Sequence, residues 1–436
     1  MKKKAFSIMV SLALLGGLIL GGCSNSDDTS NEPADSSSGD KTVVKMMHLW
    51  PEGSSKAQFT IVDNIIKAYE DANPDVDIQT EILANEQYKE KIKVLTASNE
   101  LPDIGITWAA GYMQPFVEGN MFAPLDDIVK TDQFVAGTLD AFSVDEKPYA
   151  LPLELNIAPI YYNKEIFENN GLDVPTTYDE FLNVVETLAK NDVIPITLGN
   201  KDRWTGSMWY MYLADRIGGT DTLNNAINRS GSFEDPALVK AAEEVKKLVD
   251  MGAFVKGTNG LSNDEAKGYF MNEQAAMYLM GTWELPNYTT SPDVPQEFKD
   301  KIGYFKFPTY EGGKGNIDSF VGGPGVGLFV SEQSKVKDEA KEFVAYLVEE
   351  WGKHSVVDAG VIPATKVDTS SGDLAQMYID ILNDLGNASN LTLYADVQMS
   401  AAVADVHLNQ IQALFGGQTT PEEFAKVQEE ALAAEE

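Results

Sequence analysis

The sequence predicts an α/β protein whose sheets are mainly parallel and are covered by helices on both faces. Helical and strand patterns alternate through most of the chain after residue 41, and such alternation is typical of this architecture. About 395 residues follow that position, which is enough for two domains of ordinary size. The single cysteine excludes a disulfide framework within the chain, so stability has to come from hydrophobic cores.

The individual elements follow from apolar spacing and from helix-capping signals. Apolar residues recur at helical spacing in the expected helices, and short apolar runs between turn signals indicate the strands. Thr177 with Glu180, and Ser262 with Glu265, have the spacing of a capping box, which begins a helix. In chain order we expect helix 59–69, strand 76–83, helix 88–95, strand 104–108, a helix after 177, strand 194–198, a helix after 262, strands 275–280, 302–307 and 326–330, and helices 335–350, 374–385 and 398–415.

The first 22 residues have the order of a secretory signal. Lysines at 2–4 precede an apolar stretch at 5–20, and Gly21 and Gly22 supply a small-residue cleavage site. The 16 apolar-rich positions are fewer than the ~20 that a spanning helix needs. Cys23 ends this run, and the arrangement resembles the lipobox of bacterial lipoproteins, which implies that Cys23 becomes the first mature residue and carries the lipid. The alternative is an ordinary signal that happens to contain a cysteine.

Residues 23–41 predict a lipid-anchored, flexible linker. Ser, Asn, Asp and Gly dominate this segment, and such a composition cannot bury enough apolar surface to fold. We therefore expect the linker to let the folded body, which begins at Thr42, stand off the membrane.

The chain is strongly acidic, which excludes two classes of partner. Lysine and arginine number 33 and aspartate and glutamate 67, for a net charge of −34. Loss of the three lysines at 2–4 with the signal takes the mature chain to −37. Nucleic acid and anionic lipid surfaces both require clustered positive charge, so we expect no nucleic-acid partner and membrane contact through the lipid anchor.

No residue pattern indicates a catalytic or metal centre. His48, His354 and His407 are far apart in the sequence, and none belongs to an HExxH motif. The glycine-rich run 322–327 lacks the Lys-Ser/Thr of a phosphate loop and indicates a tight approach of backbone to backbone. A glycosidase needs two carboxylates at a set separation, and no local arrangement singles out such a pair. We predict no enzymatic activity and no cofactor.

Four of the six tryptophans lie at or just after the ends of predicted strands, the first of which begins after residue 41 and ends at Trp50. They are Trp50, Trp108, Trp204 and Trp283. Ligands of open α/β sheets bind at the carboxyl ends of strands, so we expect these rings to share a cleft. Flat rings suit the apolar face of a sugar, while carboxylates and amides bond its hydroxyls. Core packing is the alternative for any one ring, and we expect it for Trp209 and Trp351, which lie within helical patterns.

Several short pieces of the sequence occur in the order of a known family. They are LPDI at 101–104 with Trp108, IYYNKEIF at 160–167 with GL at 171–172, PTTYDEF at 175–181, AAM at 275–277 with GTW at 281–283, and GQTTPEE at 417–423. On these pieces the chain resembles the family 1 extracellular solute-binding proteins of ABC importers, the group that includes maltose-binding protein. The pieces span nearly the whole body and are specific as a set.

The resemblance implies a two-lobe periplasmic-binding-protein fold of type II, with mixed sheets flanked by helices and a ligand cleft between the lobes. The ligand is trapped when the lobes close. By family position, the chain crosses between lobes near 152–156, 317–321 and 360–363. Lobe 1 would then combine residues 42–153 with 320–360, and lobe 2 would combine 154–319 with 361–436.

The resemblance also implies which residues bind the ligand. Trp108 and Trp283 match the stacking aromatics of the family, and Asn156 lies where maltose-binding protein has a glutamate beside the hinge. The predicted ligand-binding set is Trp50, Glu52, Asp103, Trp108, Asn156, Asp202, Trp204, Trp283 and Gly323. Two departures disfavour maltose: no acid follows Trp108, and Ala-Ala-Val at 401–403 replaces the expected aromatic.

These features predict a monomeric receptor at the extracytoplasmic face of the bacterial cell membrane. It would capture a mono- or oligosaccharide by lobe closure and deliver it to the permease of an ABC transporter. A binding protein for a non-sugar solute and a surface glycosidase are the alternatives. A phosphate ligand would call for arginines or helix N-termini in the cleft, and Arg203 is the only arginine among the candidates.

Overall fold

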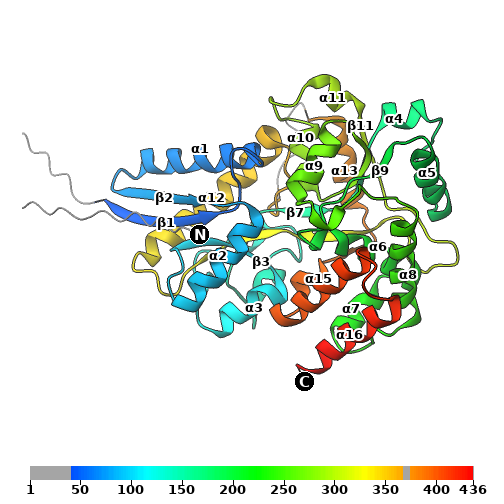
Figure 1. Cartoon of the computed structure of the whole chain (residues 1–436). Coiled ribbons are helices and arrows are strands. Elements are labelled where there is room, and N and C mark those ends of the chain that lie inside the picture. Colours follow the sequence, from blue (N-terminus) through cyan, green and yellow to red (C-terminus); the bar gives the residue numbers. More distant parts are fainter. Residues whose placement is uncertain (1–40, 367–373, 436) are drawn as a thin grey trace, which may run out of the picture. The chain divides into compact units, whose positions relative to one another are not determined.

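A computed structural model describes residues 41–366 and 374–435 (Figure 1). The predicted signal peptide, Cys23 and nearly all of the predicted linker lie outside the described residues. The described residues form two lobes, each built on one of the two main sheets. We call the part built on a five-stranded sheet lobe 1 and the part built on a four-stranded sheet lobe 2.

Lobe 1 is built on a sheet with both parallel and antiparallel pairs. Its strands lie in the order β2 (Val76–Ile82), β1 (Thr42–His48), β3 (Ile104–Trp108), β13 (Val326–Val330) and β6 (Leu151–Pro152). The first three strands are parallel, whereas β13 runs antiparallel to both neighbours. Figure 1 shows α1 (Lys56–Ala72) on one side of β1 and β2, with α2 (Asn85–Ser98) and α3 (Ala110–Glu118) on the other. Helix α12 (Lys337–His354) packs against α1.

Lobe 2 is built on four strands that are also mixed in direction. Their order is β11 (Ile302–Phe305), β8 (Ile160–Asn163), β10 (Ala275–Leu279) and β9 (Ile194–Ile196). The predicted capping boxes at Thr177 and Ser262 are confirmed, because both begin helices with reciprocal side-chain bonds. The helices next to these strands in the chain are α4 (Lys164–Asn169), α5 (Tyr178–Lys190), α9 (Asn263–Met271), α10 (Leu285–Tyr288) and α11 (Gln296–Lys301).

The described residues also contain a three-stranded sheet, a two-stranded sheet of β4 (Ser143–Val144) and β5 (Lys147–Pro148), and further helices. The three-stranded sheet contains β14 (Asn390–Thr392), β12 (Ser319–Pro324) and β7 (Leu155–Ile157). The remaining helices are α6 (Trp204–Gly218), α7 (Asp221–Ile227), α8 (Pro236–Asp250), α13 (Gln376–Gly386), α14 (Ala395–Gln398), α15 (Ala401–Phe415) and α16 (Pro421–Ala433). Trp209 and Trp351 are 0% and 1% exposed, which confirms their predicted place in the core.

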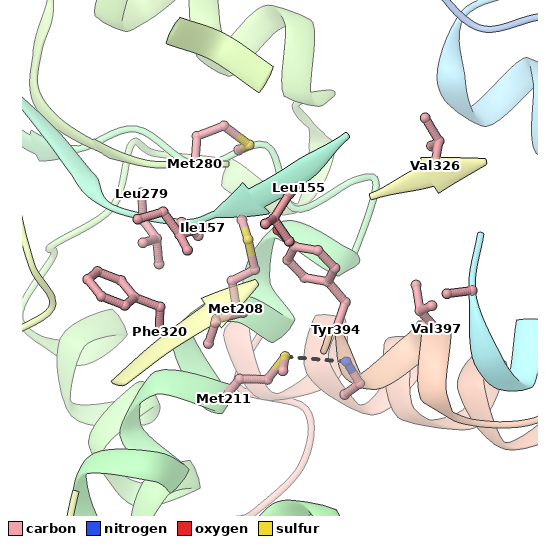
Figure 2. Close-up of a cluster of buried hydrophobic side chains, with 14 of the residues drawn as sticks. Leu155, Ile157, Met208, Met211, Leu279, Met280, Phe320, Val326, Tyr394 and Val397 are labelled. Carbon is pink, nitrogen blue, oxygen red and sulfur yellow. Dashed lines mark hydrogen bonds between the residues drawn. The ribbon is translucent and has the colours of Figure 1, made fainter. Parts of the chain in front are cut away.

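A buried cluster lies where the three-stranded sheet meets α6. Figure 2 shows Leu155 and Ile157 of β7 with Phe320 of β12 and Met208 of α6, all of them buried. In the same view the ring of Tyr394, from the segment before α14, extends toward Leu155. The cluster therefore joins β7, β12 and α6, three elements that are far apart in the sequence, in one core.

Three short segments connect the sheets. The chain leaves β6 of lobe 1 and enters β7 of the three-stranded sheet at residues 153–154, and it returns from β12 to β13 of lobe 1 at Gly325. Residues 361–363 lie beside the first of these segments, because Leu155 N donates to Ile362 O at 3.0 Å. Residues 317–321, the second predicted crossing, hold the start of β12, which precedes the return of the chain to lobe 1 at Gly325.

The mixed sheets that the family resemblance implies are confirmed, whereas two expectations drawn from the local pattern were wrong. The alternation of helices and strands predicted mainly parallel sheets, but β13 enters lobe 1 at the edge where β3 ends, where Val326 pairs with Trp108. A strand that starts at that edge has to run back against β3. The predicted helix 398–415 begins at Ala401 instead, because the Ser400 side chain caps it by accepting a hydrogen bond from Val403 N.

Candidate ligand-binding site

The carboxyl ends of strands from both lobes surround one cavity of about 470 Å³. This volume lies within the range of small-molecule sites. Trp50, Trp108, Trp204 and Trp283 all line it, as the expectation of a shared cleft requires. The four rings come from different segments, which the two main sheets bring to the same place.

Two of the tryptophans belong to lobe 1. Trp50 follows β1, is 3% exposed and stacks on Trp351 with ring centroids 5.2 Å apart, so most of its ring serves the core. Trp108 ends β3 and is only half-buried, with Tyr112 in edge contact at 5.0 Å. The Lys89 ammonium lies 4.9 Å from the Trp108 ring centroid, a cation–π arrangement that orients this ring.

The other two tryptophans belong to lobe 2 and contact each other. Trp204 begins α6, and Trp283 lies in the short 3₁₀ helix Thr282–Glu284. Their ring centroids are 5.9 Å apart at 66°, and Trp283 is 6.0 Å from the ring of Tyr394. A Cβ atom at Gly281 would lie 2.2 Å from the Trp283 ring. The ring therefore lies directly against the backbone, in a position that only glycine at 281 permits.

Charged side chains line the cavity between the rings. The acidic ones are Glu86, Glu154, Asp202, Asp264, Glu284 and Asp396. The lysines are Lys56, Lys89, Lys201 and Lys267. Carboxylates in excess over ammonium groups suit a ligand rich in hydroxyl donors, since each carboxylate can accept several hydrogen bonds.

Of the predicted polar ligand contacts, Asp202 and Asn156 line the cavity, and both already form hydrogen bonds within the protein. Asp202 accepts a hydrogen bond from Asn263 N at 2.8 Å. Burial, together with the nearby charges of Glu86 and Asp264, raises the pKa of Asp202. Asn156 is 1% exposed, and its Oδ1 accepts from Thr282 Oγ1 at 2.9 Å.

Contacts between the lobes hold the walls of the cavity together. The Trp204 indole Nε1 donates to Glu86 Oε1 at 3.2 Å, and Gln58 Nε2 donates to the Trp283 carbonyl at 3.3 Å. At the rim, the Lys56 ammonium lies 2.6 Å from Asp293 Oδ2. These bonds join α1 and α2 of lobe 1 to the segments of lobe 2 that carry the tryptophans.

Asp103 lies at the opposite end of β3 from the cavity. Its Oδ2 accepts from Lys45 N at 2.8 Å, and its Oδ1 accepts from Ser334 Oγ at 2.7 Å. Trp108, which does line the cavity, is five residues further along the strand, or about 17 Å away. Both oxygens of Asp103 thus serve the fold, and we remove it from the ligand set.

Glu52 and Gly323 also lie outside the lining. Glu52 is exposed, and its neighbours Pro51 and Ser54 reach the cavity instead. Gly323 belongs to β12 and pairs with Asn156 of β7. A Cβ at the adjacent Gly322 would lie 2.2 Å from the Asn156 carbonyl, so this glycine-rich run allows a close approach of two strands, as its composition indicated.

Sequence reasoning missed several lining residues. Glu86 and Lys89 lie three residues apart on α2, a spacing that on a helix most often marks a solvated face. Lys267 and Glu284 form an ion pair at 3.0 Å and come from segments 17 residues apart. Tyr394 lies in a short loop with no pattern of its own. None of these residues had a local signal that could have placed it in the cavity.

Within residues 41–366 and 374–435, the structure holds no group of three or more metal-ligating side chains that could bind an ion. In the same part of the chain, every helix is too short or too polar to cross a membrane.

Comparisons with known proteins agree on one family. The family model described as bacterial extracellular solute-binding protein matches residues 53–352. A multiple sugar-binding protein of Streptococcus mutans is 26% identical over 348 residues, which cover 78% of this chain and 77% of that protein. A melibiose/raffinose/stachyose-binding protein of Bacillus subtilis is 24% identical, with coverage of 83% and 81%.

Solved structures share the fold over almost their full length. One, from work on xylan utilization by the thermophilic bacterium Caldanaerobius polysaccharolyticus, is 34% identical with a TM-score of 0.84 and covers 89% of this chain and 99% of its own. A chitin oligosaccharide binding protein is 26% identical with a TM-score of 0.83, covering 91% and 100%. These neighbours share the two-lobe fold of type II. The chain belongs to the family of bacterial extracellular solute-binding proteins.

Proposed function

We propose that this protein is the oligosaccharide-binding receptor of an ABC importer. The observation that carries the proposal is a cavity in which four tryptophans and six carboxylates converge from two lobes. Aromatic faces and hydrogen-bonding carboxylates are the two kinds of surface that a sugar requires. The names of the relatives support the same ligand class, since they include binders of multiple sugars, of raffinose-type sugars and of chitin oligosaccharides.

The ligand would be held between Trp108 of lobe 1 and Trp283 of lobe 2. Because one ring belongs to each lobe, a sugar that touches both gains contacts only when the lobes are together. A ligand shifts an equilibrium between open and closed forms only through such differential contacts. We also propose Asn156, Asp202 and Trp204 as contacts, with Trp50 contributing one ring edge. The lobes would be residues 42–153 with 320–360, and 154–319 with 361–436, apart from the β12 residues that belong to the three-stranded sheet.

The finer proposals concern location and partners. A lipid on Cys23 and a linker at 23–41 would keep the receptor at the extracytoplasmic face of the membrane, as a monomer close to its permease. The Cys23→Ser variant is expected to leave the membrane fraction and to keep its sugar affinity. If this variant stayed in the membrane fraction, the lipid-anchor proposal would fail.

A ligand screen tests the function directly. The chain from Ser24 onward would be titrated with xylo-, chito-, malto- and raffinose-series oligosaccharides, and tryptophan fluorescence and thermal unfolding would be measured. A ligand that binds only the folded state raises the unfolding temperature through mass action. We expect a response within at least one oligosaccharide series, and the bound sugar should be recovered unaltered by chromatography. Response to a non-sugar solute alone would refute the proposal, and recovery of cleaved sugar would indicate a glycosidase.

A further inference from the structure

Glu154 lies where the connections between the sheets meet. It belongs to the segment between β6 and β7, and its carbonyl accepts a hydrogen bond from Gly325 N at 2.9 Å. Its backbone also forms an isolated antiparallel bridge with Pro363. One residue thus touches the return segment at Gly325 and the segment 361–363, so Glu154 occupies the hinge between the lobes.

The side chain of Glu154 lines the cavity and lacks partners. It is 3% exposed, and its Oε1 has no hydrogen-bond partner among the residues that the structure describes. The other oxygen, Oε2, accepts only from Asn156 Nδ2 at 3.4 Å. The Tyr394 hydroxyl, also part of the lining, is likewise buried without a partner. A buried polar atom without a hydrogen bond is costly, so these atoms call for donors that the protein itself does not provide.

We propose that the Glu154 carboxylate is a ligand-binding group at the hinge, which accepts a sugar hydroxyl in its ionised form and so couples sugar binding to proton release. This inference rests on the proposed function, because the hydroxyl that completes the site is the sugar's. Since Glu154 belongs to the hinge, its bond to the sugar forms at the point about which the lobes move.

The surroundings of Glu154 explain the coupling. Burial raises its pKa to about 7, against a smaller lowering effect of the Asn156 hydrogen bond. From the facing segment, the titratable groups are Tyr394, whose own pKa is raised by burial, and Asp396. No lysine, arginine or histidine in the described residues forms an ion pair with Glu154 within 4.0 Å. Without a sugar, the carboxyl therefore retains its proton for part of the time near neutral pH.

A sugar hydroxyl changes this balance. A hydrogen bond from a hydroxyl to a carboxylate is charge-assisted and about twice as strong as one between neutral groups. Bonding to the ionised form lowers the pKa of a carboxyl group, so the proton that Glu154 holds in the free protein leaves when the sugar binds. If the bound sugar keeps Glu154 ionised throughout the range from pH 6 to pH 8, linkage makes the affinity about tenfold higher at pH 8 than at pH 6.

Isothermal titration calorimetry tests the inference with the strongest sugar from the screen. The dissociation constant would be measured between pH 6 and 8, in buffers with different ionisation enthalpies that report the number of protons released. For the wild type we expect the tenfold gain in affinity and release of about half a proton or more near pH 7. Glu154→Gln should bind at pH 8 about tenfold more weakly, with no proton release and little change of affinity with pH. Glu118→Gln, on an exposed residue of α3, is the matched control and should behave as the wild type.

The outcomes separate this inference from the function on which it rests. Sugar binding with no pH dependence and no proton release in the wild type would overturn the role of Glu154 and leave the sugar-binding function intact. Persistence of the wild-type pH dependence in Glu154→Gln would also overturn it, because another group would then release the proton. Absence of binding to any sugar would overturn the proposed function and this inference with it. The wild-type measurement alone decides the case if the variant does not fold.

Discussion

Gly281→Ala should weaken sugar binding by moving a neighbouring ring rather than by removing it. The backbone at Gly281 has φ −68° and ψ 162°, which alanine adopts without strain. A Cβ there would lie 2.2 Å from the Trp283 ring, whereas carbon atoms in contact prefer about 3.5–4.0 Å. The ring therefore has to move by roughly 1.3–1.8 Å, away from the backbone and into the cavity.

The magnitude follows from what a stacked ring contributes. Specific aromatic contacts contribute about 0.5–1.5 kcal/mol beyond their buried area. Losing that amount raises the dissociation constant by about twofold to tenfold. Trp283 is only half-buried and faces the cavity, so the ring has space to move. We therefore expect the free energy of unfolding to fall by less than the ~1–3 kcal/mol that overpacking costs in a closed core.

A double-mutant cycle isolates this effect. Trp283→Ala should abolish most of the affinity and leave the fold intact, and Gly281→Ala should add nothing in that background because the ring that it displaces is gone. Gly53→Ala is the matched control, since a Cβ at Gly53 would meet no atom within 4 Å. Fluorescence titration gives the affinities, and urea denaturation gives the stabilities. An equal loss from Gly281→Ala with and without Trp283 would refute the reasoning.

Three further predictions concern stability and the rim of the cavity. Burial lowers the pKa of His48 from 6.5 to about 4. As the pH falls from 6.5 to 4, only the unfolded chain takes up this proton, so the free energy of unfolding should decrease by up to about 3 kcal/mol. In urea titrations, His48→Gln should remove this part of the decrease. Arg216→Ala should lower the free energy of unfolding by about 3–5 kcal/mol in the same urea titrations. The reason is that the fully buried guanidinium pairs with Asp215 and donates to two backbone carbonyls. A loss below about 1 kcal/mol would contradict this prediction. Asp293→Asn should change the sugar dissociation constant less than about fivefold, because the side chains of its ion pair are largely exposed, 44% for Lys56 and 57% for Asp293. A larger change would mean that this pair at the rim governs closure of the lobes.

The sequence predicts the elements that have a clear period or cap and fails where burial removes the period. The helices α5 and α9 begin at their predicted capping boxes. Helix α6 was predicted only as a helical pattern around Trp209, without bounds, because 13 of its 15 residues are buried and no polar face marks where the helix begins and ends. The direction of β13 was not predictable from the strand itself, since it depends on where the crossing at Gly325 enters the sheet.

The candidate site was predictable to the extent that one general rule applied. The rule that ligands bind at the carboxyl ends of strands brought Trp50, Trp108, Trp204 and Trp283 together, and all four line the cavity. The rule says nothing about residues on helices or in crossings. Glu86 on α2 and Tyr394 before α14 reach the cavity only through the packing of the two lobes.

Asp103 and Glu154 show why residue type and neighbourhood do not suffice to identify a binding carboxylate. Asp103 lies in one of the pieces that carry the family resemblance, yet both of its oxygens already accept hydrogen bonds from the protein. Glu154 lies in no quoted piece, yet it faces the cavity with one oxygen unpartnered. A carboxylate with all of its donors within the protein has little left to offer a ligand, whereas one that is buried and unpartnered is stabilised by any donor that arrives. The partners of Asp103 lie 58 and 231 residues away in the sequence, so the difference between the two carboxylates emerges only when the chain is folded.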